Sequence, residues 1–442
     1  MDIAPLLQRF ENHEARIGVV GLGYVGLPLI LEFAQKGYRS IGFDIVEAHC
    51  QSLRQGRSYI AHIPSESIEQ QVKAGRLDAT TDFARIGEAD AVLICVPTPL
   101  SRHLEPDLSY VTATAESIAP YVKPGCLVAL ESTTYPGTTQ EALAPILEKH
   151  GRKVGEDLFL AYSPEREDPG RGGDHSAPAI PKVVGADDEA SRALAQALYK
   201  DIVPQVVLVA STRVAEAVKL TENIFRAVNI ALVNELKIVY TRMGIDVWEV
   251  IDAAKTKPFG FMPFYPGPGL GGHCIPIDPF YLTWKAREFK CNTRFIELAG
   301  EVNSAMPRYV IDRLTGALNE RRKALKGSRV LLLGIAYKSD VDDMRESPSL
   351  ELFDLLLGSG AEVAFYDPHI PVIPPSREHG RLAGRKSIEW RPEAIAEFDA
   401  VLIATAHGCV DYEELVRNAQ LVVDARNATR DVSEGREKIV MA

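Results

Sequence analysis

The chain lacks the features that mark several large classes of protein. Its 442 residues contain no run of 18 apolar residues, and residues 1–16 contain no apolar segment of the kind found in secretion signals. The formal net charge of -11 leaves no basic excess, and no block of like charge forms a binding tail. We therefore expect no nucleic-acid partner and no membrane partner.

Cysteine is scarce as well, and its spacing is irregular. The six cysteines form no CxxC pair; they are Cys50, Cys95, Cys126, Cys274, Cys291 and Cys409. This pattern favours a reducing compartment over a disulfide framework and shows no metal-ligand spacing. We expect a cytoplasmic protein without a metal site.

What is present is the alternation of short apolar runs with helical stretches. At this length two or three domains are expected. In the first half the expected strands are Ile17–Gly21, Ser40–Asp44, Ala91–Val96 and Leu127–Leu130. In the second half they are Arg329–Leu333, Glu362–Tyr366, Ala400–Ala404 and Leu421–Asp424. This rhythm predicts an α/β fold with two Rossmann-like, doubly wound parallel-sheet domains.

Between these halves, Ser211 to Arg242 contains no Gly or Pro, and its apolar residues recur at helical spacing. A helix of about 30 residues is too long for a simple crossover, so it is expected to connect the halves. We expect a nucleotide-binding domain at 1–205, a central helical domain at 206–310 and a second Rossmann-like domain at 311–442. The long helix also offers a dimer interface, and we expect a homodimer or a larger homo-oligomer.

A glycine motif follows the first expected strand. Gly21, Gly23 and Gly26 match GxGxxG between a strand and a helix, and Asp44 ends the next strand. The glycines allow a pyrophosphate to approach the backbone, and Asp44 can accept hydrogen bonds from a ribose. Because the Asp44 carboxylate repels a 2′-phosphate, NAD is favoured over NADP. A structural glycine turn without a ligand is the alternative.

Two further loops leave strand ends in the same half, and each carries a threonine. Thr98 follows one expected strand and Thr133 follows another. Ligands of open α/β sheets bind at these ends. Either threonine alone is also an ordinary helix cap or turn residue.

Cys274 lies in a glycine-rich segment, residues 266–279. The glycines remove bulk around the thiol, which suits a nucleophile that a substrate must reach. A small buried apolar residue in a glycine turn is the alternative. Lys219, Asn223 and Arg226 share one face of the long helix and suit an oxyanion or a phosphate, although a solvated helix face would look the same.

Charged residues also follow short apolar stretches at other positions. Glu165, Glu167 and Asp168 could supply a general base, or could form a charged surface turn. In the second half, basic residues at strand ends could bind phosphates without a glycine loop. The basic residues are Lys338, Arg345 and Arg426, and Tyr337 stands directly before Lys338.

Together these motifs resemble the UDP-glucose/GDP-mannose dehydrogenase family from about Arg16 to the end of the sequence. The motifs are GLGYVGLP, STTYPGTT, YSPER, the helix with Lys219 and Asn223, PGPGLGGHCIPIDP and YKSDVDDMRESP. Within the family the chain looks most like the UDP-N-acetylglucosamine 6-dehydrogenases. The resemblance implies that residues 1–205 bind NAD and that residues 311–442 bind UDP.

The resemblance also implies a reaction. The family oxidises the C6 alcohol of a nucleotide sugar to a carboxylate with two NAD, through a cysteine thiohemiacetal and thioester. For this chain it implies conversion of UDP-GlcNAc to its uronic acid, for a surface polysaccharide such as lipopolysaccharide. UDP-glucose, UDP-ManNAc and UDP-GalNAc remain open as substrates. More distant alternatives are a two-electron β-hydroxyacid dehydrogenase, which does not need Cys274, and an NAD-sensing module.

Roles carry over residue by residue. Cys274 would be the nucleophile, Lys219 and Asn223 would stabilise the oxyanion, and Asp278 would assist the lysine and water. Thr133 and Glu165 would position or activate water. The implied NAD contacts are Tyr24, Val25, Asp44, Thr98, Thr133 and Arg345, beside the glycines. The implied contacts to the UDP-sugar are Arg166, Glu167, Lys219, Asn223, Arg226, Phe264, Tyr265, Gly267, Gly271, Tyr337, Lys338 and Arg426.

Two departures leave points open. UDP-glucose enzymes carry a second glutamate where this chain has Pro169, so the base is Glu165, Glu167 or Asp168. Those enzymes also place an arginine before the glycine loop, where this chain has Lys255 and Lys257. A contact from one subunit to its partner's substrate is therefore left open.

Overall fold

The computed structural model describes residues 1–442 except 61–62, 102, 167–178, 273–274 and 377–378. It divides into two compact units. The first comprises Met1–Glu222 and Phe280–Cys291, and the second comprises Asn223–Pro279 and Asn292–Ala442. Within the described residues, no helix is both long enough and apolar enough to cross a membrane.

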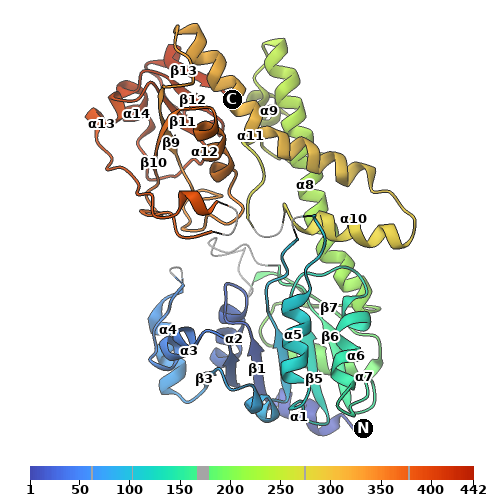
Figure 1. Ribbon diagram of the computed structural model, residues 1–442. Coiled ribbons are helices and arrows are strands. Elements are labelled where there is room, and N and C mark those ends of the chain that lie inside the picture. The colour runs from blue at the N-terminus through green and yellow to red at the C-terminus, as the bar shows by residue number, and fades with distance from the viewer. Residues whose placement is uncertain (61–62, 102, 167–178, 273–274, 377–378) are drawn as a thin grey trace. The chain divides into compact units, whose positions relative to one another are not determined.

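The first unit is built on an eight-stranded sheet in the order β3-β2-β1-β4-β5-β6-β7-β8 (Figure 1). The strands are β1 (Arg16–Val20), β2 (Arg39–Phe43), β3 (Leu77–Thr80), β4 (Ala91–Ile94), β5 (Cys126–Leu130), β6 (Leu158–Tyr162), β7 (Lys182–Gly185) and β8 (Val206–Val209). All neighbours are parallel except β6 and β7. The parallel part is the predicted dinucleotide-binding sheet.

Apolar side chains cover both faces of this sheet. Leu93 belongs to one core, whereas Val92 and Ile94 belong to the other, as the two-residue repeat of a strand requires. The first core includes residues of α2 (Gly26–Gln35) and α7 (Glu189–Tyr199). The second includes residues of α5 (Ser109–Ile118) and α6 (Ala144–Glu148). Burial on both faces explains why these strands are continuous apolar runs.

The second unit contains a five-stranded parallel sheet in the order β10-β9-β11-β12-β13. Its strands are β9 (Arg329–Leu333), β10 (Glu362–Tyr366), β11 (Ala400–Ile403), β12 (Val422–Asp424) and β13 (Ile439–Met441). Residues of α11 (Arg294–Glu320) and α12 (Pro348–Gly358) pack on one face. Residues of α13 (Pro392–Ala396) and α14 (Tyr412–Asn418) pack on the other.

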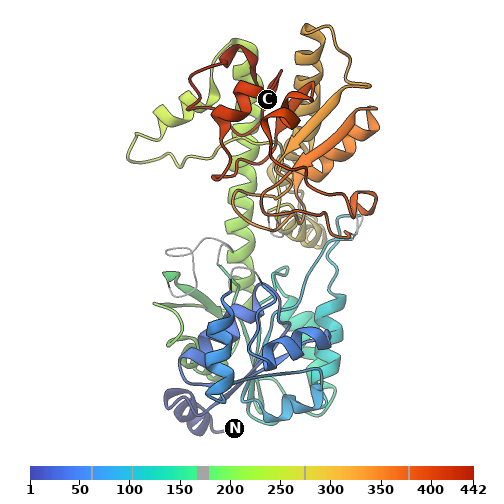
Figure 2. The same ribbon diagram turned by 90° about the vertical axis from the view of Figure 1, so that its left-hand side faces the viewer.

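The longest helix, α8 (Thr212–Met243), is uninterrupted and connects the two units along the chain (Figures 1 and 2). It is followed by α9 (Val247–Ala254) and α10 (Asp278–Glu288). The remaining α-helices of the described residues are α1 (Ala4–Glu11), α3 (Glu47–Arg54) and α4 (Ser65–Lys73). The predicted fold class is confirmed: two parallel-sheet domains joined by a long helix. The predicted boundaries of three domains stay a prediction.

Candidate active site

The glycine turn of the first unit lies at the carboxyl end of β1. Gly21 has φ +89°, and a Cβ there would lie 2.5 Å from the carbonyl oxygen of Cys95. A Cβ at Gly26 would lie 1.8 Å from the Gly21 carbonyl oxygen, whereas a Cβ at Gly23 would meet nothing within 4 Å. Gly21 and Gly26 are thus required by packing, and Gly23 leaves the exposed side of the turn open to a ligand.

The predicted cofactor residues around this turn are brought together. Tyr24 and Val25 directly precede Gly26, where α2 begins. At the end of β2, the Asp44 carboxylate accepts hydrogen bonds from the backbone N–H groups of Leu22 (3.0 Å) and Val46 (2.9 Å). A carboxylate has about four acceptor positions, so Asp44 retains capacity for ribose hydroxyls. The open turn, the helix start and this carboxylate fit a dinucleotide.

The two threonine loops lie at the ends of the next strands. Thr98 follows β4 and Thr133 follows β5, and both threonines are half-buried. The Ser132 hydroxyl donates to the Val96 carbonyl (2.7 Å), and the Tyr281 hydroxyl donates to the Thr98 carbonyl (2.9 Å). The two loops are therefore tied to each other and to α10. Arg345, the remaining predicted cofactor contact, belongs to the second unit, where it pairs with Asp343 (2.6 Å).

A buried charge cluster lies beside the predicted base Glu165. The ammonium group of Lys182, at the start of β7, lies 2.8 Å from the Glu131 carboxylate and 3.4 Å from that of Glu165. The Tyr199 hydroxyl donates to Glu131. Burial alone would lower the pKa of Lys182, but the two carboxylates raise it above its usual value, so this lysine is charged.

Lys219 and Arg166 contact the same segment. Lys219 is buried on α8, and its ammonium group donates to the backbone carbonyl of Glu165. Arg166 donates to the Pro181 carbonyl (2.6 Å) and to Glu222 of α8 (2.6 Å). The predicted catalytic lysine and predicted base are therefore adjacent. The predicted substrate contact Arg166 is engaged in holding this segment against α8.

In the second unit the other predicted catalytic residues also meet. The buried side chain of Asn223, one turn after Lys219 on α8, donates to the buried carboxylate of Asp278 at the start of α10. Arg226 donates to the Asn223 side-chain oxygen. The helix therefore presents a lysine and an amide, with the amide oriented by a carboxylate and a guanidinium.

The glycine loop before Cys274 contacts the predicted substrate residues of the second unit. A Cβ at Gly267 would lie 2.4 Å from the Arg426 guanidinium, and a Cβ at Gly271 would lie 2.8 Å from Tyr337. The ammonium group of Lys338 lies 5.6 Å from the centre of the Tyr337 ring. At Gly271 the close atoms are the Cβ of Tyr337 and the Glu346 carbonyl oxygen, so a larger residue would be excluded and the loop packs directly on the segment after β9.

The two aromatic residues before this loop have other neighbours. The Phe264 ring meets Phe225 of α8 edge to face at 5.7 Å. The Tyr265 ring stacks on Trp248 of α9, and its hydroxyl donates to Asp252 (2.8 Å). These contacts fix the entry to the glycine loop. The predicted residues Cys274, Glu167 and Asp168 lie outside the described residues.

Sequence reasoning missed an asparagine pair that holds the loop. The Asn234 side chain on α8 accepts the N–H of Gly267 (3.0 Å) and donates to Asn303 of α11 (2.9 Å). Asn303 in turn donates to the Ala227 carbonyl (3.0 Å). The sequence did offer one signal, an asparagine in an otherwise apolar stretch of the helix. A buried amide needs hydrogen-bond partners, so such a residue indicates a tertiary contact.

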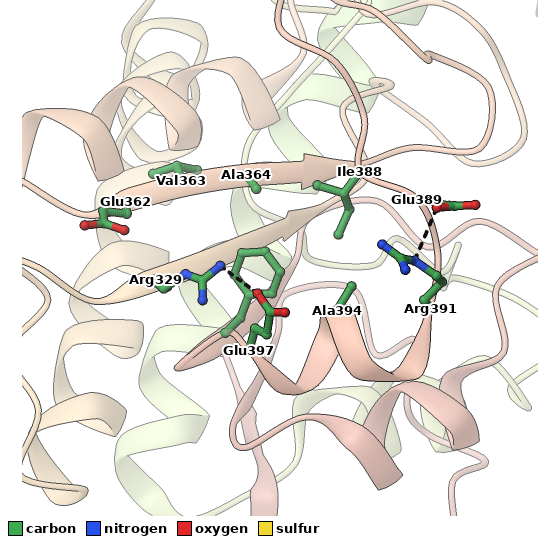
Figure 3. Close-up of a pocket in the computed structure, with 10 residues that line it drawn as sticks. Arg329, Glu362, Val363, Ala364, Ile388, Glu389, Arg391, Ala394 and Glu397 are labelled. Atoms are coloured by element: carbon green, nitrogen blue, oxygen red, sulfur yellow. Dashed lines mark hydrogen bonds and ion pairs between the residues drawn. The ribbon is translucent and has the colours of Figure 1, made fainter.

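One open pocket lies elsewhere in the second unit, with a volume of about 360 Å³ (Figure 3). It runs beside β10 and α13, and two surface ion pairs line it, Arg329 with Glu397 (3.0 Å) and Arg391 with Glu389 (3.2 Å). Arg329 and Glu362 are the first residues of their strands, opposite the end where such sheets bind ligands. It contains none of the predicted site residues.

A doubly wound sheet with an open glycine turn, in a unit that also holds a buried lysine in contact with a glutamate segment, is typical of an NAD-dependent dehydrogenase. Three family models describe the chain. The NAD binding domain, central domain and UDP binding domain of the UDP-glucose/GDP-mannose dehydrogenase family match residues 15–203, 213–305 and 331–431. The chain belongs to the UDP-glucose/GDP-mannose dehydrogenase family.

Individual relatives agree with this. The chain is 37% identical to a UDP-N-acetyl-D-glucosamine 6-dehydrogenase of Pseudomonas aeruginosa, over 89% of this chain and 91% of the relative. It is 34% identical to a UDP-N-acetyl-D-mannosamine dehydrogenase of Pyrococcus horikoshii, over 95% and 97%. The solved structure of a UDP-D-ManNAc dehydrogenase from Pyrococcus horikoshii matches with a TM-score of 0.85 at 32% identity, covering 96% of this chain and 98% of that one.

Proposed function

We propose that this dehydrogenase oxidises the C6 alcohol of a UDP-N-acetylhexosamine, with UDP-GlcNAc as the expected substrate, to the carboxylate. The observation that carries the proposal is the burial of Lys219 and Asn223 one turn apart on α8, each already held by a partner of the proposed site. A buried ammonium group and a buried amide side by side suit an oxygen that becomes negatively charged. The 37% identity to a UDP-N-acetyl-D-glucosamine 6-dehydrogenase supports the choice of sugar.

Full oxidation of an alcohol to an acid without release of the aldehyde requires a covalent anchor. NAD bound at the glycine turn would supply the hydride acceptor for each of the two oxidations. The Cys274 thiolate would add to the C6 aldehyde, and the resulting thiohemiacetal would become a thioester after the second oxidation. Water would then add to the thioester carbon, the carbon–sulfur bond would break, and the thiolate would be regenerated.

The protein groups have separate tasks in this scheme. The neutral amine form of Lys219 would accept the alcohol proton, and the ammonium group so formed would stabilise the oxyanion. Asn223, oriented by Asp278, would donate a hydrogen bond to the same oxygen. Glu165 would take the proton of the attacking water, with Thr133 positioning that water. Of the three carboxylates left open by the sequence, Glu165 is the one whose partners are described, and both of its oxygens are held.

The test is the number of NADH produced per limiting substrate. UDP-GlcNAc, UDP-ManNAc, UDP-GalNAc and UDP-glucose are assayed in parallel with the wild type and with Cys274→Ala. We expect two NADH per UDP-GlcNAc for the wild type. The variant is expected to release no acid, because the thioester cannot form. Cys291→Ala is the matched control, since Cys291 is an exposed free cysteine outside the proposed site.

Other outcomes identify the alternatives. Two NADH on UDP-ManNAc but not on UDP-GlcNAc would keep the chemistry and move the substrate to that of the mannosamine relative. One NADH per substrate, with Cys274→Ala fully active, would point to a two-electron dehydrogenase of the β-hydroxyacid type. No turnover on any UDP-sugar would contradict the proposal altogether.

We also propose that the enzyme is a homo-oligomer in the cytoplasm, serving surface polysaccharide synthesis. Phe225, Leu232 and Val239 recur every seven residues on α8, and between 44% and 53% of each is exposed. An apolar stripe of this kind is typical of a helix that packs on another copy. Light scattering should give at least twice the mass of one chain, and Leu232→Glu should reduce it; a wild type of one-chain mass would exclude the oligomer.

A further inference from the structure

The carboxylate of Glu165 is held on both sides by groups that the proposed scheme does not use. One oxygen, Oε1, accepts the backbone N–H of Arg166 (2.6 Å), and the other, Oε2, lies 3.4 Å from the ammonium group of Lys182. Lys219 donates to the backbone carbonyl of the same residue. The side chain is therefore oriented by Lys182, while its main chain is tied to the proposed catalytic lysine.

Lys182 is shared with a second carboxylate. Its ammonium group lies 2.8 Å from Glu131, which directly follows β5, and the Tyr199 hydroxyl donates to Glu131 from α7. The lysine side chain is 6% exposed and Glu131 is fully buried, whereas Glu165 is 18% exposed. Of the two carboxylates, only Glu165 has access to solvent, and hence to the water of the proposed reaction.

We propose that Lys182 and Glu131 are positioning residues that set the charge and orientation of Glu165: Lys182 holds it ionised and aimed, and Glu131 limits this effect by sharing the same ammonium group. The proposal rests on the proposed function in one respect, the use of Glu165 as the base for hydrolysis. In that step one O–H bond of water breaks, its proton moves to Glu165, and its oxygen bonds to the thioester carbon. A carboxylate that is already protonated cannot take part.

Opposite effects of Lys182 and Glu131 on the pKa of Glu165 explain why both neighbours are needed. An ammonium group within about 4–6 Å lowers the pKa of a carboxyl by about 1–3 units. A base that holds its charge too strongly is a weak proton acceptor, so catalysis is best when the pKa lies near the working pH. Glu131, by pairing more closely with Lys182, leaves Glu165 less strongly stabilised in its charged form.

Other charged or titratable groups near Glu165 come from each element around it. Among the described residues they are Cys95 after β4, Glu131 after β5, Arg166 with Glu222 of α8, Lys182 of β7, Tyr199 of α7 and Lys219 of α8. Burial raises the pKa of the Cys95 thiol and keeps it neutral. Lys182 and Glu131 are therefore the pair whose removal changes the charge facing the Glu165 side chain while leaving Lys219 intact.

The test compares pH profiles of kcat for acid formation. Lys182→Met should move the acidic limb to higher pH by about 1–3 units, because Glu165 loses its ammonium neighbour. Glu131→Gln should move the same limb to lower pH by about one unit, because the charge of Lys182 then has Glu165 as its one carboxylate partner of the pair. KM for the UDP-sugar should not change in either variant. Opposite shifts are the signature, since a merely structural pair would lower activity without moving the limb in two directions.

Conservative and double variants complete the set. Lys182→Arg keeps the charge and should restore the wild-type limb, and the Lys182→Met/Glu131→Gln double variant should lie between the single variants. If Lys182→Met does not fold, Glu131→Gln retains the cation and still tests the direction of the shift, with Lys182→Arg as the control that should not move it. Acidic limbs of Lys182→Met and Glu131→Gln that coincide with that of the wild type would overturn the proposal.

A second readout does not depend on turnover. The carboxyl carbon of Glu165 can be titrated by NMR in 13C-glutamate-labelled enzyme and assigned by its loss in Glu165→Gln. Its pKa should rise in Lys182→Met and fall in Glu131→Gln. If the wild type oxidises no UDP-sugar, the proposed function is wrong, but the titration still shows whether Lys182 and Glu131 set the pKa of Glu165. If the enzyme oxidises a UDP-sugar and the pKa of Glu165 is the same in all variants, only this inference is wrong.

Discussion

The first turn of the sheet in each unit is built from a glycine and an aspartate. Gly21 after β1 and Gly334 after β9 both have φ +89°. Each donates its N–H to the last residue of the neighbouring strand, at 2.8 Å to Phe43 and to Tyr366. An aspartate directly follows that neighbouring strand in both units, and it accepts an N–H from the turn. The two turns start from the same construction.

The two turns differ in how many hydrogen bonds the aspartate accepts from the protein itself. Asp44 accepts from two backbone N–H groups and is partly exposed. Asp367 is fully buried and accepts from four backbone N–H groups and from the His407 ring. Since a carboxylate has about four acceptor positions, Asp367 has none left for a ribose. The aspartate of the first turn therefore keeps acceptor capacity for a ligand, whereas the protein's own donors use that of the aspartate of the second turn.

His407 supports the second turn through both of its ring nitrogens. Its Nε2 lies 3.2 Å from Asp367, and its Nδ1 accepts the backbone N–H of Asp340 (3.1 Å), an arrangement that fits the tautomer with hydrogen on Nε2. Asp340, His369 and His407 bring three side-chain ligand atoms within 4.8 Å of one another. Because both ring nitrogens of His407 already have partners, we assign this group a structural role.

The largest difference between the two turns is expected when the glycines of the first turn are replaced. Gly26→Ala places a methyl group 1.8 Å from a backbone oxygen, so we expect a loss of at least about 3 kcal/mol of unfolding free energy and no NAD binding. Gly23→Ala meets nothing within 4 Å and should leave the melting temperature unchanged. It should nonetheless weaken NAD binding about tenfold or more, because its methyl group blocks the pyrophosphate.

Calorimetric titration with NAD and thermal unfolding by circular dichroism separate the two variants. Ala336 occupies the corresponding part of the second turn, where it is buried, donates to Asp367 and accepts from Thr405 (2.6 Å). Ala336→Gly is the matched control and should leave NAD affinity unaltered. Unchanged NAD affinity in Gly23→Ala would show that the open side of the first turn does not receive the cofactor.

Most of the fold could be predicted because its strands are buried on both faces. Arg329–Leu333 and Glu362–Tyr366 were predicted with their observed bounds, and the long helix was predicted within one residue at each end. The strands β3, β6, β7, β8 and β13 were not predicted. β7 begins with Lys182, and lysine is seldom buried unless it is paired. Its partner Glu131 is 51 residues away in the sequence, so local pattern gives no signal.

The candidate site was predictable to the extent that its residues carry recognisable chemistry. Residues that the sequence analysis singled out lie in contact within each unit: Asp44 with the glycine turn, Lys219 with Glu165, and Asn223 with Asp278. Their roles stay predictions. What the sequence could not indicate is which polar residues support them. Lys182, Asn234 and Asn303 act through tertiary contacts, and each would pass as an ordinary strand or helix residue. Their burial follows from folding and not from any motif.

The second prediction concerns the two aspartates. Asp367→Asn should destabilise the second unit by about 3 kcal/mol, because the amide keeps only one acceptor oxygen and places its NH2 group against donors that the carboxylate now accepts. Burial alone would raise the pKa of Asp367, but the hydrogen bonds from His407 and the backbone bring it below its usual value. A lowered pKa in the folded state means that this stability is present above about pH 4 and is lost as the pH falls through the folded value. Urea unfolding at pH 7 and at acid pH should show a smaller acid-induced loss in Asp367→Asn than in the wild type.

Asp44→Asn is the matched change in the first unit and has the smaller expected effect. Asp44 accepts only two backbone N–H groups and is partly exposed, so its unfolding free energy at pH 7 should change by less than about 1 kcal/mol. Its consequence should appear in cofactor choice, because removing the negative charge relieves repulsion of a 2′-phosphate. We expect the ratio of kcat/KM for NADP to that for NAD to rise about tenfold, equivalent to about 1.4 kcal/mol. If Asp44→Asn were as destabilising as Asp367→Asn and left the NADP ratio unchanged, the two aspartates would do the same structural work, and spare acceptor capacity would not distinguish the two turns.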